Sequence, residues 1–96
     1  MDAEAFMKDH ADKASSGRVA EIMGDLTPEA MQQVMQLMAG GPASPTKYNV
    51  TPVSSGNGDH IFDVTYSDND GKSVSMRETV RELDGKWRIV HLEKPA

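Results

Sequence analysis

Residues 76–94, MRETVRELDGKWRIVHLEK, decide the fold because they read as two β-strands joined by a tight turn at Asp84-Gly85. Apolar and polar side chains alternate on both sides of this turn, which is typical of strands with one buried face. A two-residue turn also fixes which residues pair across the hairpin, and it places Glu78 opposite His91. The stretch therefore predicts a carboxylate beside an imidazole on an otherwise apolar face.

The preceding hairpin predicts the same inner face. A three-residue loop, Asn69-Asp70-Gly71, pairs Asp68 with Lys72 and therefore brings Phe62 opposite Glu78. Both hairpins then agree on one set of inward residues. This set is Phe62, Val64, Tyr66, Val74, Met76, Glu78, Val80, Trp87, Ile89 and His91.

The first forty residues follow helical spacing instead. Their apolar stripes predict three short helices within about 2–40, with Asp2 and Thr27 as N-caps. The first stripe contains Ala3, Phe6, Met7, His10 and Ala14. A Pro/Ser linker, 41–46, precedes four strands at about 47–54, 59–67, 72–83 and 86–93. We expect one α+β domain over residues 1–96, with the helices packed on a curved four-stranded antiparallel sheet.

Composition narrows the classes of function. A net charge of −5 disfavours nucleic acid and acidic membranes as partners, because both are bound largely through Lys and Arg. The absence of cysteine excludes disulfides and thiol chemistry. No apolar run has the length of a membrane span, and the first ten residues lack the pattern of a secretion signal. We expect a cytoplasmic protein, or an extracytoplasmic one if an export segment has been removed.

Two segments carry a resemblance to a known family. Residues 64–92, VTYSDNDGKSVSMRETVRELDGKWRIVHL, contain an Asp-Gly-Lys-Trp turn followed by the aliphatic Ile89. Residues 5–30, AFMKDHADKASSGRVAEIMGDLTPEA, read as two helices with a break of small residues between them. Together they resemble short bacterial members, of unknown function, of the nuclear transport factor 2-like superfamily, also called cystatin-like or SnoaL-like.

The resemblance implies a cone-shaped sheet around a cavity closed by helices, often dimeric through the sheet. Members of that superfamily include isomerases, dehydratases and cyclases as well as non-catalytic binding domains, so the resemblance does not choose a function. This chain lacks the additional early strands of the larger enzymes. Their tyrosine and acidic pair has no match here, so no catalytic residue is carried over.

The expected cavity gives the candidate site. Its candidate ligand-binding residues are His10, Phe62, Tyr66, Met76, Glu78, Trp87 and His91. Glu78 could orient His91 and make it a proton acceptor, so this pair is the candidate for catalysis. The alternative is a pair that merely satisfies its own hydrogen bonds near an open end of the sheet. The three histidines lack the local spacing of metal ligands, and we expect neither a metal nor a cofactor.

Methionines and the outer sheet face leave further alternatives. Met23, Met31, Met35 and Met38 suit core packing, or a soft wall facing an apolar ligand. The outer face is expected to carry Asp63, Arg77, Thr79, Arg81, Arg88, Val90 and Leu92. Arg77 falls opposite Asp63, whereas Arg81 faces Arg88, and this mixture of arginine and aliphatic residues favours a homodimer through the outer face over bare solvent exposure.

These observations favour a small non-catalytic binding or interaction domain with a modest apolar cavity and an unidentified ligand. One alternative is an isomerase, dehydratase or cyclase that uses the pair of Glu78 and His91. The other is an accessory domain whose cavity is filled by its own side chains. The openness and the lining of the cavity distinguish the three.

Overall fold

The helices begin where the sequence provides caps. The structure is a computed structural model, and it describes residues 1–95. Helix α1 (Ala3–Ser15) is capped by Asp2, which accepts a hydrogen bond from the Ala5 amide at 2.8 Å. Helix α3 (Pro28–Leu37) is capped by Thr27, and its first residue is the proline expected there. Between them lies α2 (Val19–Met23), a short helix without a side-chain cap or a buried residue.

Four strands follow the linker and form an antiparallel meander. They are β1 (Lys47–Gly56), β2 (Asp59–Ser67), β3 (Ser73–Leu83) and β4 (Lys86–Glu93), in the spatial order β1-β2-β3-β4. Asp84 and Gly85 both have positive φ in the last turn, as a two-residue hairpin requires. The α+β class, with helices packed on a four-stranded antiparallel sheet, is confirmed.

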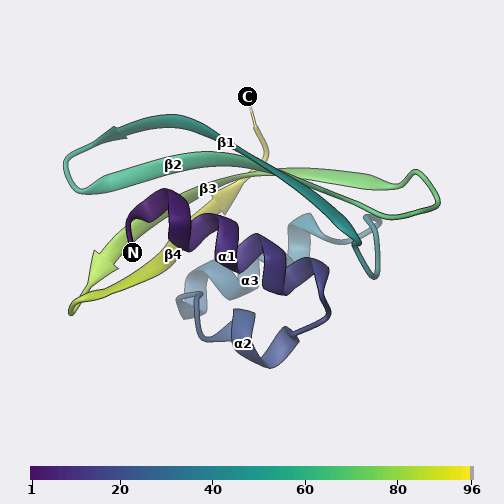
Figure 1. The fold of residues 1–96 in the computed structure, drawn as a ribbon, viewed down its shortest axis with the longest axis horizontal. Coiled ribbons are helices and arrows are strands. Elements are labelled where there is room, and N and C mark those ends of the chain that lie inside the picture. Colours follow the sequence, from purple (N-terminus) through teal and green to yellow (C-terminus); the bar gives the residue numbers. More distant parts are fainter. Residues whose placement is uncertain (96) are drawn as a thin grey trace.

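The three helices cover one face of the curved sheet and leave the other face uncovered (Figure 1). Helix α1 runs directly beneath the sheet, whereas α2 lies farthest from it in this view. The core fills the space between the layers. Its buried apolar residues are Ala3, Phe6, Met7, Ala11, Ala30, Phe62, Val64, Tyr66, Met76, Val80, Ile89 and Leu92.

The register between β2 and β3 is the predicted one. Phe62 pairs with Glu78, and Asp63 pairs with Arg77 on the outer face. The Arg77 guanidinium donates two hydrogen bonds to the Asp63 carboxylate, at 2.8 and 3.0 Å. These cross-strand pairs confirm that the loop at 69–71 sets the alignment of the two strands.

The predicted pairing of Glu78 with His91 is wrong. Between the turn and the pair of Val80 with Ile89, the register of β3 with β4 is the expected one. Beyond that pair it shifts by one residue. Thr79 pairs with His91, and Glu78 pairs with Leu92. The shift is a β-bulge that leaves Val90 without a Cα partner and reverses the facing of every later residue of β4.

The bulge changes which residue near the C-terminal end of β4 faces the core. Leu92, expected on the outer face, is buried with 3% of its surface exposed. His91, expected on the inner face, has a side chain that is 44% exposed. The outer edge of β4 is also engaged at this point: Ile89 donates to the Asp25 carbonyl at 2.8 Å and accepts from the Thr27 amide at 3.1 Å.

The outer face carries its own charge pairing. Arg81 lies opposite Arg88, as the turn predicts. Arg81 also donates two hydrogen bonds to Asp59 on β2, at 2.7 and 3.2 Å. A carboxylate of the same chain therefore relieves the repulsion between the two arginines. Among residues 1–95, no helix is long and apolar enough to cross a membrane.

Candidate functional site

A pocket of about 420 Å³ lies between the helices and the inner face of the sheet. Residues from all three helices, the linker and the two central strands line it. They are His10, Ala14, Val19, Ile22, Met23, Leu26, Met31, Val34, Met35, Met38, Ala43, Pro45, Tyr66, Met76 and Glu78. Only His10, Tyr66 and Glu78 of this set carry a hydrogen-bonding side chain, so the pocket is apolar with a few polar groups, as small-molecule sites generally are.

Glu78 is the most unusual of these polar residues. It lies on the inner face of β3 with 1% of its surface exposed. Within residues 1–95, its Oε2 atom is buried without a hydrogen-bond partner. Burial disfavours the charged carboxylate and raises the pKa of Glu78 to about 7, although His10 opposes the rise. A buried carboxyl without a partner costs stability, so packing alone does not explain its presence.

Tyr66 and Met76 line the same pocket as Glu78, from the two central strands. Tyr66 pairs with Val74 across the strands, and Val64 pairs with Met76, so both side chains point inward. Burial raises the pKa of the Tyr66 phenol, and the nearby Glu78 adds to the rise. Tyr66 therefore stays protonated at neutral pH and presents a neutral hydroxyl to the pocket.

His10 is held by the carboxylate of Asp25. Its Nδ1 lies 2.9 Å from Asp25 Oδ2, and Lys13 Nζ lies 3.1 Å from the same oxygen. Burial alone would raise the pKa of Asp25, yet the hydrogen bonds with His10 and Lys13 outweigh it and lower that pKa. Burial lowers the pKa of Lys13, but its hydrogen bonds to Asp25 and Asp9 outweigh this effect and raise that pKa overall. This cluster fixes the ring of His10 at the pocket wall.

The four methionines line the pocket, and Met38 also packs against the core. Met23, Met31, Met35 and Met38 all belong to its wall. Met35 is 69% exposed and Met23 is 52% exposed, so neither fills the core. The open side of the pocket is therefore bordered by flexible apolar side chains, which adapt to ligands of different shape.

Of the seven predicted site residues, four line this pocket. They are His10, Tyr66, Met76 and Glu78. The other three lie elsewhere. Phe62 lines a hollow near the N-terminus, and the Trp87 indole donates to the Met1 carbonyl at 2.9 Å and contacts the edge of the His60 ring.

His91 is the third residue outside the pocket. Its Nδ1 lies 3.2 Å from Gln33 Nε2 on α3, and its Nε2 lies 3.6 Å from the Glu93 carboxylate. Gln33 also accepts a hydrogen bond from the Leu92 amide at 2.7 Å. His91 thus belongs to the contact between α3 and the bulged strand, and it does not form the predicted pair with Glu78.

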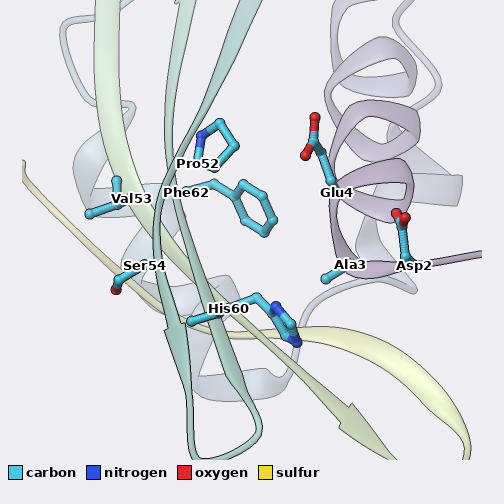
Figure 2. Close-up of a pocket in the computed structure, with 9 residues that line it drawn as sticks. Asp2, Ala3, Glu4, Pro52, Val53, Ser54, His60 and Phe62 are labelled. Atoms are coloured by element: carbon cyan, nitrogen blue, oxygen red, sulfur yellow. The ribbon is translucent and has the colours of Figure 1, made fainter.

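The hollow beside Phe62 is a second, more polar depression of about 360 Å³. Figure 2 shows the start of α1, with Asp2 and Glu4, on one side of it and β1 and β2 on the other. His60 and Phe62 point into the space between them. Asp2 is engaged as the helix cap, and in the part of the chain that the structure describes no group of three His, Asp or Glu residues could hold a metal ion.

Sequence reasoning missed Asp25 and the contribution of α2. The stripe of Val19, Ile22 and Met23 indicates a helix, but it does not tell that these side chains border a pocket rather than fill a core. Asp25 follows that helix and has no local signal for a contact with His10, fifteen residues earlier.

Comparison of the chain with protein-family models, with curated proteins and with solved structures finds no match.

Proposed function

We propose that this chain is a small, non-catalytic binding domain whose ligand is an apolar molecule held between the helices and the sheet. The observation that carries the proposal is the pocket of about 420 Å³ with Glu78 buried in its wall. Apolar side chains supply affinity through burial, and a few convergent polar groups orient the ligand. The volume of the pocket lies within the range of about 300–1,000 Å³ that is usual for small-molecule sites.

A binding role is favoured over catalysis by the positions of the titratable groups. Acid and base chemistry requires groups within reach of the same substrate. His91 lies at the contact of β4 with α3, and Leu92 takes the place opposite Glu78 that was expected for the histidine. His10 already engages Asp25 through Nδ1. Glu78 shares the pocket with His10 and the neutral Tyr66, but the predicted base His91 lies outside it, which suits recognition better than proton transfer.

Membership of the nuclear transport factor 2-like superfamily, with its cone-shaped sheet, remains part of the proposal. Three helices followed by an antiparallel meander, with a pocket under the sheet, are consistent with it. Self-association through the outer sheet face is proposed with it, because the helices leave that face uncovered and it carries Ile61 among internally paired charges. Sedimentation at tens of micromolar should give a dimer, and a monomer there contradicts this surface as the dimer contact.

The binding proposal is tested by filling the pocket. Ala14 lines it from α1, so Ala14→Phe should occupy the space that a ligand needs. Ala5→Phe is the matched control, because Ala5 is exposed on the same helix. The uncharged probe N-phenyl-1-naphthylamine should bind the native chain and the control with similar affinity and should bind Ala14→Phe at least about tenfold more weakly.

Equal binding of the probe to both variants would contradict the proposed site. A lack of binding to the native chain, with the fold confirmed by circular dichroism, would contradict a ligand-binding function for the pocket and favour an accessory domain.

A further inference from the structure

The side chains around Glu78 restrict the chemistry of a ligand. From α1, His10 faces the pocket and is held by Asp25, which also binds Lys13. From β2, Tyr66 faces it with a neutral hydroxyl. The lining residues of α2 and α3 are all apolar, and the β4 residue opposite Glu78 is Leu92. Among the described residues, the wall therefore contains no lysine or arginine that could neutralise a ligand anion.

We infer that the ligand of this pocket is an apolar molecule with one protonated amine, which pairs with the Glu78 carboxylate. This inference rests on the proposed binding function. Glu78 is fully buried, lines the pocket and has an oxygen without a partner in residues 1–95, so the site has an unused acceptor. An ammonium group supplies both the donor and the charge that this acceptor lacks.

The remaining features agree with a cation that carries an apolar tail. A buried ion pair is stable only when further hydrogen bonds satisfy the charged groups. Tyr66 lines the same pocket, and Glu78 is near enough to raise the pKa of its phenol, so the neutral hydroxyl can accept a hydrogen bond from a polar group of the ligand. The tail would lie along the methionines of α2 and α3, toward the open side at Met23 and Met35. The net charge of −5 also attracts cations to the protein.

The direction of the pH dependence separates an amine from a neutral ligand. In the free protein Glu78 has a pKa of about 7, so below neutral pH an amine must displace a proton from the carboxyl in order to bind. Its affinity should therefore rise from about pH 5.5 to 8, a range in which an alkyl amine stays protonated. A neutral acceptor such as an alcohol would use the protonated carboxyl as a donor, and its affinity would fall over that range.

Three probes with the same ten-carbon tail test the inference by calorimetry: decylamine, decanol and decanoic acid. Decylamine should bind most tightly, and its affinity should rise with pH. Glu78→Gln should weaken decylamine by about tenfold or more while changing decanol by less than about threefold. Glu82→Gln, an exposed carboxyl on the same strand, is the control and should change neither.

The other outcomes contradict either the amine or the binding pocket itself. Equal affinity for the three probes, or decanol binding best and weakening with pH, overturns the amine but leaves a binding pocket. A Glu78→Gln variant that is folded by circular dichroism and keeps its affinity for decylamine also overturns it. No binding of any probe overturns the proposed function together with the inference.

Discussion

At the scale of the residue, Glu78 links the stability of the fold to pH. A carboxyl buried among apolar side chains is stable when protonated and costly when ionised. The folded chain has such a group in the pocket wall, and within residues 1–95 its Oε2 atom has no hydrogen-bond partner. Sites that bind or react with ligands commonly retain a group that the fold itself does not need.

The stability of the folded chain should therefore fall with rising pH through this residue. Burial raises the pKa of Glu78 from 4.5 to about 7, so between these values the folded state holds a proton that the unfolded state has released. The free energy of unfolding, measured against Glu78→Gln by urea denaturation, should fall by about 3 kcal/mol between pH 4.5 and 7 and then stay level.

Glu82→Gln provides the reference for this measurement, because Glu82 is exposed and its replacement should leave the pH profile of the native chain unchanged. A profile of Glu78→Gln parallel to that of the native chain would show that Glu78 ionises normally in the folded state.

The sequence predicted part of the site at this scale. Periodicity places His10 on the inner stripe of the first helix, and two turn lengths place Tyr66, Met76 and Glu78 on the inner face, so these four could be found without a structure. Asp25, the partner of His10, could not be found in this way, because the contact depends on how α1 packs against the segment that follows α2. Contacts of this kind are set by packing between elements rather than by local pattern.

At the scale of the element, the strand β4 shows where pattern reasoning fails. Turn chemistry fixes the register correctly from Leu83 and Lys86 to Val80 and Ile89. Beyond that point the bulge at Val90 inserts one residue, so a strict alternation assigns the wrong face to His91 and Leu92. Both the loop at 25–27 and Gln33 bind this part of β4 from its outer edge, and neither contact leaves a signal in the sequence of the strand.

The side chain of Gln33 should hold α3 to the bulged strand. Its Oε1 accepts from the Leu92 amide at 2.7 Å, and its Nε2 lies 3.2 Å from His91 Nδ1. Gln33→Ala removes the acceptor of a backbone amide and should lower the free energy of unfolding by about 1–3 kcal/mol in urea denaturation.

Gln32 is the neighbouring exposed glutamine of α3, so Gln32→Ala should change stability by less than about 0.5 kcal/mol. Similar losses from the two substitutions would mean that the contact with β4 contributes nothing beyond helix propensity.

At the scale of the whole molecule, the layers explain why a chain of 96 residues holds a pocket at all. The sheet offers one curved apolar face, and α1 covers it directly while α2 stands away from it (Figure 1). The side chains of α2 and of the outer part of α3 therefore border a space instead of closing it. The two-layer arrangement followed from the change of hydrophobic period along the sequence. The sequence did not predict that α2 leaves part of the inner sheet face uncovered.

The most direct test of the account is to locate a bound apolar probe by amide chemical shifts in an NMR titration with N-phenyl-1-naphthylamine. We expect the largest shifts at the lining residues of α2 and α3 and at Met76 and Glu78 on β3. Shifts centred on the outer sheet face, or on the hollow beside His60 and Ser54 (Figure 2), would contradict the pocket between the helices and the sheet as the binding site.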